Sequence, residues 1–335
     1  MFEISVIIPV YNVSDTIERC AESLFSQTKK EVQYIFINDC TPDNSVELLE
    51  SLLNGRFPEL RDQVQIINLE KNSGQGTARR IGLKAAEGSY VAFCDSDDWV
   101  EPTCYEKMYA CTDSGQVDIV VCDYFEEYKQ KTVVHHEKTI DPNPVAALRD
   151  SYKNYFKQYL WNKLLKRSIL EENNIELEKG INLWEDELYL DRMFLCSKSL
   201  KQTSEPLYHY NKANMKSTTR LVRDKHIPQL KYVTDVLTAE YAKYDGFEKV
   251  TDFLQYRSRL QMLRDKKSDL ELFRTMYPES GKYIKEYDLS GFSTLGKLRI
   301  KLIQLHLESL CIYMAKLKSF TIRKMFWNLH LPITK

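Results

Sequence analysis

Short apolar runs alternate with amphipathic segments along the first part of this chain, and this alternation restricts its fold more than any other feature. The runs are rich in β-branched residues, which predicts strands buried on both faces. The segments between them carry helix-start residues and single apolar stripes, which predicts helices. The expected strands are residues 4–8, 32–37, 64–69, 90–94 and 118–122. Repeated strand–helix–strand units predict an α/β fold with a mainly parallel sheet and right-handed crossovers.

Three helices are expected between these strands. The first opens at Ser14-Asp15, and Glu18 stands at capping-box spacing from the aspartate. The second spans 46–53 after Thr41-Pro42, where threonine would be the N-cap and proline suits the first turn. The third spans 77–86 and follows a glycine turn.

Polar residues follow each of the first four expected strands. The polar segments are residues 9–12, 38–39, 72–74 and 95–98. The carboxyl ends of parallel strands meet at one edge of an open α/β sheet, and ligands bind outside that edge. We therefore expect the four loops to form one ligand site.

Three aspartates, Asp95, Asp97 and Asp98, stand at the end of the fourth strand. Carboxylates two residues apart at a strand end can present oxygens to one hard divalent cation, such as Mg²⁺ or Mn²⁺. Crowded acids without a nearby base are unfavourable unless a cation neutralises them. The alternative is a helix cap and turn, for which one aspartate would suffice.

Residues 74–80 form a glycine turn that enters the third helix. Backbone N–H groups there, together with Arg79, could receive a phosphate. The segment lacks the last glycine of a dinucleotide fingerprint, and the chain contains no GK[ST] P-loop. A phosphate contact and a purely structural turn remain alternative interpretations.

The charge is unevenly distributed along the chain. The net charge is −1, yet residues 297–335 carry eight Lys and Arg against one acid, so this segment is +7 and the remainder is −8. A near-zero total argues against a protein that coats nucleic acid. The eight cysteines form no CxxC pair, which favours reduced thiols and a cytoplasmic location. The apolar run at the amino terminus is too short for a signal peptide or a membrane span.

The motifs, taken in order, resemble glycosyltransferase family 2, whose members are inverting, nucleotide-sugar-dependent enzymes of the GT-A fold. The motifs that carry the resemblance are Val6–Asn12, Asn38–Asp43, Asn72–Gly74 with Ala78-Arg79, and Tyr90–Trp99. The motifs that resemble the bacterial capsule and exopolysaccharide branch are Trp161–Leu164, Trp184–Leu188, Tyr208–Tyr210 and Ser217–Thr219. The resemblance covers roughly residues 3–220. Two positions depart from the family pattern, because Cys40 replaces a usual glycine and Arg80 a usual asparagine.

The resemblance implies a role for several individual residues. The residues assigned to the donor are Pro9, Tyr11, Asp39, Arg79 and Asp95. Asp95 and Asp97 would form a DxD pair that binds Mn²⁺ or Mg²⁺, with Asp97 as the principal ligand. Asp186 would deprotonate the acceptor hydroxyl.

Glu185 and Asp186 open an amphipathic helix. Acids at a helix start are stabilised by the helix dipole, so these two residues alone favour a capping role. With the upstream motifs in order, the base interpretation of Asp186 is preferred, and the helix terminus is expected to keep Asp186 ionised. His209 is expected to be a structural histidine, with a metal or phosphate contact as the alternative.

Residues 221–335 are expected to form a helical extension after a catalytic domain of residues 1–220. In the segment 297–335, leucines recur among lysines, which suits a helix that lies on an anionic membrane surface. A basic helix packed on the protein and a homodimer contact are the alternatives. The location expected from these features is cytoplasmic, with peripheral attachment to the inner face of the plasma membrane as an option.

The resemblance implies transfer of a sugar from a nucleotide-diphosphate donor to a hydroxyl of a glycan or a polyprenyl-linked acceptor in surface polysaccharide synthesis. The expected donor is a UDP-sugar. One rival class is a sugar nucleotidyltransferase, which would carry its glycine loop after the first strand, where this chain has residues 9–12. The other rival is a non-catalytic assembly protein. The retention of four mutually repelling carboxylates argues against it, namely Asp39, Asp95, Asp97 and Asp186.

Overall fold

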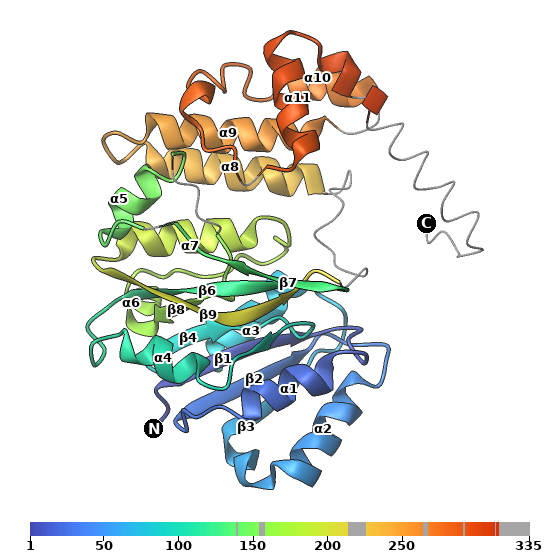
Figure 1. Ribbon diagram of the computed structural model, residues 1–335, viewed down its shortest axis with the longest axis vertical. Helices are drawn as coiled ribbons and strands as arrows, with labels where there is room; N and C mark the ends of the chain where they lie inside the picture. Colours follow the sequence, from blue (N-terminus) through green and yellow to red (C-terminus); the bar gives the residue numbers. More distant parts are fainter. Residues whose placement is uncertain are drawn as a thin grey trace, which may run out of the picture. The chain divides into compact units, whose positions relative to one another are not determined.

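Figure 1 shows the computed structural model of the protein, which describes residues 1–138, 140–153, 158–213, 226–263, 267–290, 292–311 and 313–314. The chain divides into two compact units. The first comprises Met1–Leu148 and Phe156–Leu221, and the second comprises Arg149–Tyr155 and Val222–Lys335. The domain boundary expected between residues 220 and 221, and the motif at 217–219, lie outside the described residues.

The first unit is built on a sheet whose first four strands are parallel. These strands are β1 (Ile4–Val10), β2 (Val32–Asn38), β3 (Val64–Asn68) and β4 (Tyr90–Phe93). They stand in the order β3-β2-β1-β4, so β1 lies between β2 and β4 and is parallel to both. All four are present close to their predicted bounds, and their carboxyl ends share one edge as expected.

The other half of the sheet is mixed. Its strands are β5 (Trp99–Val100), β6 (Ile119–Tyr128), β7 (Lys131–His135), β8 (Lys163–Lys166) and β9 (Leu200–Asn211). β8 is antiparallel to β4 and β6, whereas β9 is parallel to β6 and antiparallel to β5. β7 returns along β6 as a hairpin after a two-residue turn, a connection that only antiparallel strands permit. The α/β class is confirmed, but the mainly parallel order holds only for β1–β4.

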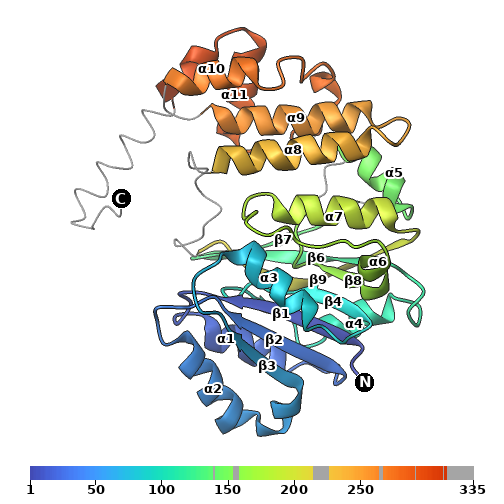
Figure 2. The ribbon, with the colours of Figure 1, turned by 180° about the vertical axis from the view of Figure 1, so that it is seen from behind.

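Helices cover both faces of this sheet (Figures 1 and 2). One face carries α1 (Ile17–Phe25), α2 (Ser45–Arg56) and α4 (Cys104–Ala110). The opposite face carries α3 (Gln75–Lys84), α6 (Arg167–Glu172) and α7 (Glu185–Cys196). A short helix, α5 (Pro144–Arg149), follows β7.

Alternate residues of β1 serve the two helical layers. Val6 and Ile8 are fully buried in the core with Leu24 of α1. Ile7 points to the other face, where Gly82 of α3 lies so close that an added Cβ would be 2.4 Å from Ile7 Cγ2. The apolar run therefore holds a helix on each side, which explains why it lacks polar alternation.

The expected start of the first helix and the expected N-cap of the second are wrong. α1 begins at Ile17 with Thr16 as its N-cap residue, because the N–H groups of both residues donate to Val13 O in a preceding turn. The capping box predicted from Ser14-Asp15 therefore does not open this helix. α2 begins at Ser45 instead of following Thr41-Pro42 directly, and Asn44 is its N-cap residue. The third helix is present at Gln75–Lys84, within a few residues of its predicted bounds.

The second unit is helical where it is described, as expected. Its helices are α8 (Ile227–Tyr241), α9 (Glu248–Met262), α10 (Lys267–Thr275) and α11 (Thr294–Gln304). α9 packs against both α8 and α10. Within the described part of the chain, no helix is long and apolar enough to cross a membrane.

Candidate active site

The loops after β1 and β2 are bound together at the sheet edge. The backbone N–H of Asn12 donates to Thr41 Oγ1 at 2.8 Å, and that of Ser14 donates to Asp43 Oδ2 at 2.9 Å. Several such hydrogen bonds lower the pKa of Asp43, although its partial burial opposes them. Thr41 therefore serves the loop that presents Tyr11, which is 47% exposed.

Asp39 connects this pair of loops to the glycine turn. Its carboxylate is buried, and its two oxygens accept hydrogen bonds from the N–H groups of Ser73 at 2.7 Å and Gly74 at 2.8 Å. The structure thus brings the predicted donor residues Pro9, Tyr11 and Asp39 to one edge, and it adds a role in loop positioning for Asp39.

The glycines of the turn make room for another segment of the chain. Gly74 has a φ of 86°, and a Cβ there would lie 2.4 Å from Asn182 Oδ1. At Gly76 a Cβ would lie 2.2 Å from the backbone oxygen of Ile181. The N–H of Gly76 donates to Asn182 Oδ1 at 3.1 Å. The approach of residues 181–182, which lead into α7, accounts for these glycines and favours the structural interpretation of the turn.

Arg79 lies inside the protein between two acidic groups. Only 4% of its side chain is exposed. One guanidinium nitrogen donates to Asp95 Oδ1 at 2.6 Å, and another donates to Glu185 Oε1 at 3.0 Å. Burial alone would lower the pKa of Arg79, but the two carboxylates outweigh it and raise that pKa, so the residue stays charged. Arg79 thereby joins the acidic loop after β4 to the start of α7.

The three aspartates of the acidic loop occupy different environments. Asp95 and Asp97 are partly exposed, whereas Asp98 is buried. Burial raises the pKa of Asp98 well above its usual range, and the neighbouring Asp97 and Asp95 raise it further. Asp98 is therefore a structural acid, while Asp95 and Asp97 remain partly accessible after β4.

Strand β9 holds the acidic loop in place. The hydroxyl of Tyr208 donates to Asp98 Oδ2 at 2.7 Å and accepts from the N–H of Asp95 at 3.1 Å. The N–H of Asn211 donates to Asp98 Oδ1 at 2.7 Å, and its side-chain amide donates to the Asp97 carbonyl at 3.0 Å. The backbone of both predicted metal ligands is thus anchored from β9.

The Trp161–Leu164 motif supports this anchor from behind. Trp161 stacks on Tyr208 with 4.4 Å between ring centroids. The buried Asn162 donates to Cys122 O at 3.1 Å and accepts from Lys163 Nζ at 2.9 Å. Burial lowers the pKa of Lys163 to about 8, although Glu137 opposes that shift. The motif therefore forms a buried polar network under the site.

The start of α7 places Asp186 beside Glu185. Trp184, the residue before them, has a φ of 59°, in the left-handed region that bulky residues rarely adopt. Glu185 is buried against Arg79, and Asp186 is partly buried with Oδ1 accepting from the N–H of Glu187 at 2.9 Å. Burial raises the pKa of Asp186 to about 7, the Glu185 carboxylate adds to the shift, and Arg79 opposes it. The helix terminus was expected to keep Asp186 ionised, but burial and the Glu185 carboxylate instead raise its pKa toward neutral pH.

His209 has the structural environment that was expected. Its Nδ1 lies 2.8 Å from Glu127 Oε1 and its Nε2 lies 2.8 Å from Glu101 Oε1. The ring is stacked between Trp99 and Phe125. Both nitrogens are engaged by protein carboxylates, so the residue contributes to packing behind the acidic loop.

The acidic loop offers a pair of carboxylates to a divalent cation. Among the described residues, no three His, Cys, Asp or Glu side chains converge as a complete metal cluster. Asp95 and Asp97 offer hard carboxylate oxygens, the type that Mg²⁺ and Mn²⁺ prefer. Mg²⁺ is commonly held by one or two carboxylates together with substrate phosphates. The pair therefore fits an ion that shares its ligands with a bound diphosphate.

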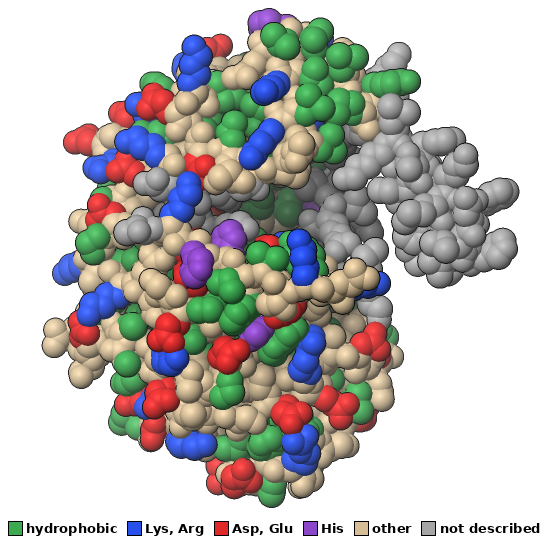
Figure 3. Space-filling model, viewed as in Figure 1, with side chains coloured by type: hydrophobic (Ala, Val, Ile, Leu, Met, Phe, Trp, Pro, Cys, Tyr) green, Lys and Arg blue, Asp and Glu red, His purple; other side chains and the backbone are tan. Residues whose placement is uncertain are grey.

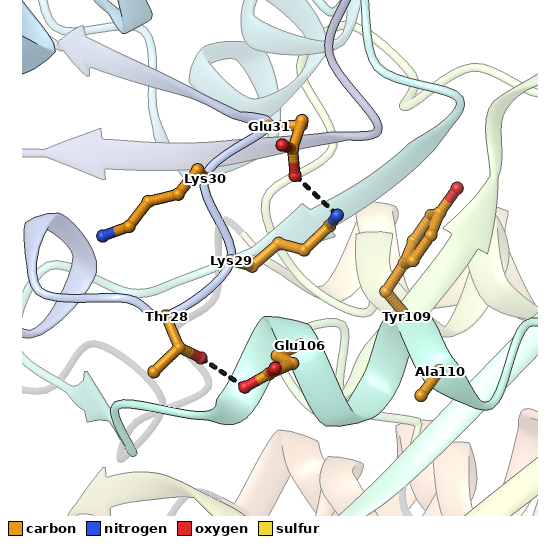
Figure 4. Close-up of a pocket in the computed structure, with 7 residues that line it drawn as sticks. All are labelled: Thr28, Lys29, Lys30, Glu31, Glu106, Tyr109 and Ala110. Carbon is orange, nitrogen blue, oxygen red and sulfur yellow. Dashed lines mark hydrogen bonds and ion pairs between the residues drawn. The ribbon is translucent and has the colours of Figure 1, made fainter.

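A cavity of about 300 Å³ lies elsewhere in this unit (Figure 4). It is lined by residues 28–31, which precede β2, and by Glu106, Tyr109 and Ala110 of the α4 region. Lys29 crosses it to pair with Glu31. The cavity is at the amino end of β2, whereas the predicted site residues follow the carboxyl ends of the strands, so the two are separate.

Two contributors to the site were not assigned a role from sequence. The sequence indicates only a capping role for Glu185 and gives no signal for Asn211. The long-range partners of these residues are set by sheet and helix packing, which local spacing does not encode. Tyr208 was noted as part of a motif, and its alternation on β9 was the one available signal for an inward-facing group.

Together, the mixed sheet, the acidic loop after β4 and the acidic start of α7 define a protein of the GT-A fold. Residues 5–174 match the family described as Glycosyl transferase family 2, and the chain belongs to this family. The resemblance found in the sequence is therefore confirmed.

Individual known proteins support the assignment. The chain is 29% identical over 234 residues to the uncharacterized glycosyltransferase EpsJ of Bacillus subtilis (strain 168), and the match covers 67% of this chain. It spans 66% of EpsJ, which is just under two thirds of that relative.

Two solved structures show the likeness in fold. S. aureus TarS 1–349 in complex with UDP-GlcNAc has a TM-score of 0.69 at 17% identity, covering 99% of this chain and 93% of that one. The mannosyltransferase PcManGT from Pyrobaculum calidifontis, in complex with GDP-Man and Mn²⁺, has a TM-score of 0.51 at 13% identity, covering 98% of this chain and 87% of that one. At these identities the likeness concerns the fold alone.

Proposed function

We propose that this protein is an inverting glycosyltransferase that moves a sugar from a nucleotide-diphosphate donor to an acceptor hydroxyl, with a UDP-sugar as the expected donor. The observation that carries the proposal is the double contact of Arg79 with Asp95 and Glu185. It places the loop suited to a diphosphate-bound cation beside the helix start that carries Asp186. This contact supports the proposal, because the proposed metal-binding loop and the proposed base would then belong to one site.

Asp95 and Asp97 would hold Mn²⁺ or Mg²⁺ together with the donor diphosphate. When bound, such an ion neutralises charge that develops on the departing diphosphate. The ion pair of Arg79 with Asp95 and the hydrogen bonds from β9 would keep the acidic loop in position as the donor binds. PcManGT, which has the same fold, was solved with GDP-Man and Mn²⁺.

Pro9, Tyr11 and Asp39 would bind the nucleotide at the ends of β1 and β2. Tyr11 is exposed and can pack against a ring, and Asp39 keeps the turn at 73–74 in place. The buried Arg79 would act on the donor through Asp95. The complex of TarS with UDP-GlcNAc supports UDP-sugars as the first donors to test.

Asp186 would take the proton from the attacking acceptor hydroxyl. A general base works best when its pKa lies near the working pH, and that of Asp186 is raised to about 7. One direct displacement by the hydroxyl inverts the anomeric centre. We propose a growing glycan or a polyprenyl-linked saccharide of surface polysaccharide synthesis as the acceptor.

Two other functions would leave different products. A sugar nucleotidyltransferase would exchange pyrophosphate into a nucleoside triphosphate. A non-catalytic assembly protein would neither exchange pyrophosphate nor release nucleoside diphosphate. The packing of residues 181–182 on Gly74 and Gly76 argues against a sugar nucleotidyltransferase, because it gives these glycines a structural role.

The test is donor turnover with a panel of nucleotide sugars, with and without Mn²⁺ or Mg²⁺. The expected result is slow, metal-dependent release of nucleoside diphosphate from one donor. Calorimetry with the nucleoside diphosphate and Mn²⁺ then compares the wild type with Asp97→Ala. We expect the variant to stay folded and to lose metal-dependent binding, with Asp113→Ala, at an exposed aspartate on another loop, as the control. Undiminished affinity in Asp97→Ala would remove the metal assignment, and pyrophosphate exchange would replace the transferase proposal.

A further inference from the structure

The second unit exposes a concentrated set of large apolar side chains. Of the twelve large hydrophobic residues that are exposed in the described part of the chain, six lie between residues 295 and 313. We call these six the apolar patch: Leu295, Leu298, Leu305, Leu307, Leu310 and Tyr313. Figure 3 shows hydrophobic side chains gathered over α10 and α11, at the top of the view, with Lys and Arg beside them. Contiguous exposed apolar surface of this kind marks a site of interaction.

Helix α11 is apolar on two faces. Its inner face packs through Ile300, which is 1% exposed, and Ile303, which is 9% exposed. Its outer stripe has leucines spaced three, four and three residues apart, at Leu295, Leu298, Leu302 and Leu305. That spacing keeps them on one side of a helix. The inner face already satisfies the packing of the helix, so the outer leucines are not needed by the core of this unit.

Basic residues border the outer stripe. Lys297 and Lys301 are exposed on α11, between the leucines in sequence. The acid in this region is Glu308, whose Oε2 lies 3.9 Å from a guanidinium nitrogen of Arg274 on α10. Residues 315–335 lie outside the described residues, but the sequence adds five more Lys and Arg there and no acid. The segment 297–335 therefore has a net charge of +7 in sequence, and its described part combines basic residues with exposed leucines.

We infer that this surface docks on an anionic lipid bilayer. Leucines at the acyl boundary with lysines at the phosphate level match the two chemical layers of such a surface. The charge also selects against the main rival occupant, a second copy of the patch. A two-fold contact would place the same patch against itself and bring two cationic segments together.

The experiment is co-sedimentation of the full chain with vesicles. Vesicles of phosphatidylcholine with phosphatidylglycerol are compared with vesicles of phosphatidylcholine alone, at low and high salt. The protein should bind the anionic vesicles, and salt should weaken the binding because exposed charges are screened. The partition coefficient should fall about 25-fold for each basic residue reversed, since a reversal changes the charge by two and each unit is worth about fivefold, and about tenfold or more for each leucine lost from the stripe.

Matched variants separate the two contributions. Leu298→Gln with Leu305→Gln removes apolar area, and Val133→Gln with Val134→Gln does the same at similarly exposed residues of β7. Lys297→Glu with Lys301→Glu reverses the charge that borders the apolar patch. Lys198→Glu with Lys243→Glu makes the same change in net charge outside it. Circular dichroism confirms that each variant is folded.

We expect both patch variants to lose binding and both controls to retain it. Equal loss in patch variants and controls, or binding that ignores lipid charge and salt, overturns the inference. Light scattering without vesicles provides a further test. If the wild type is a dimer and Leu298→Gln with Leu305→Gln is a monomer, the patch is a self-contact and the inference is also overturned. None of these measurements depends on sugar transfer.

Discussion

Arg79 donates a hydrogen bond to Asp95 Oδ1 at 2.6 Å from a position where only 4% of its side chain is exposed. The same guanidinium reaches Glu185 at 3.0 Å. A buried cation between two acids is stable only while all three groups are present, because each alone would carry an uncompensated charge. This triad fixes the distance between the two halves of the candidate site.

Replacing Arg79 should therefore be costly. Arg79→Met leaves the buried Glu185 without its partner, and we expect the free energy of unfolding to fall by about 3–5 kcal/mol in urea titration. Arg79→Lys keeps the charge but lacks the planar fork, so an intermediate loss is expected. Arg80→Met is the control, because Arg80 pairs with Glu176 near the surface and should cost about 1 kcal/mol or less. Equal losses at residues 79 and 80 would contradict the triad.

Tyr208 is expected to position the acidic loop. Tyr208→Phe removes a donor from the buried Asp98 and an acceptor from the N–H of Asp95. We expect a loss of about 1–3 kcal/mol in stability, together with weaker Mn²⁺-dependent binding of nucleoside diphosphate by calorimetry. Tyr128→Phe is the matched control, since Tyr128 is 40% exposed and its hydroxyl donates to Glu126. A Tyr208→Phe protein that loses stability but keeps its metal-dependent binding would show that the hydroxyl serves the fold alone.

Much of the parallel half of the fold was predictable from local sequence. Apolar runs define β1 to β4, and the polar residue after each run defines the edge where the loops gather. The direction of β8 and β9 was not predictable, because strand polarity depends on how the chain returns to the sheet. The start of α1 and the N-cap residue of α2 were misplaced because several Ser, Thr, Asp and Asn residues compete for the N-cap position.

The site was predictable in its members more than in its contacts. Asp95 and Asp97 stand out by spacing, but the burial of Asp98 depends on Tyr208, more than a hundred residues away. The raised pKa of Asp186 was also missed, because it comes from desolvation and from Glu185, whereas the sequence indicates only the helix dipole. Such terms arise from tertiary packing.

Cys40 stands at a position where the backbone favours glycine. Its φ is 54°, in the left-handed region, where a side chain costs about 1–2 kcal/mol. We expect Cys40→Gly to be at least as stable as the wild type, because relief of strain offsets the added chain entropy. Cys40→Val should lose about 1–2 kcal/mol, since a branched Cβ is least tolerated there.

The control for Cys40 is Cys111, which has a φ of −73°. At Cys111 the glycine variant should not be more stable than the valine variant, because no left-handed strain is relieved there. Thermal unfolding of the four variants measures both pairs. If the glycine and valine variants of Cys40 unfold at the same temperature, the backbone at this position is not strained.

Asp186→Asn should separate binding from transfer. We expect the affinity for the donor to be retained and turnover to fall by about 10²–10⁴-fold, the usual contribution of a positioned base. In the wild type, kcat/KM should rise with pH up to about 7 and then level off, because the base must lose its proton. In the Asp186→Asn variant, kcat/KM should not show this rise with pH. Asp191→Asn, the same change further along α7, is the control.

The same substitution should change stability with pH in a defined direction. The fold raises the pKa of Asp186 to about 7, from about 3.9 in an unfolded chain. The folded protein therefore binds more protons between these values, and its stability falls as pH rises through that window. Asn carries no charge, so Asp186→Asn should gain stability relative to the wild type above pH 7, and the gain should vanish near pH 4. If the difference between the two proteins is independent of pH while transfer stays near normal, Asp186 caps the helix and the base lies elsewhere.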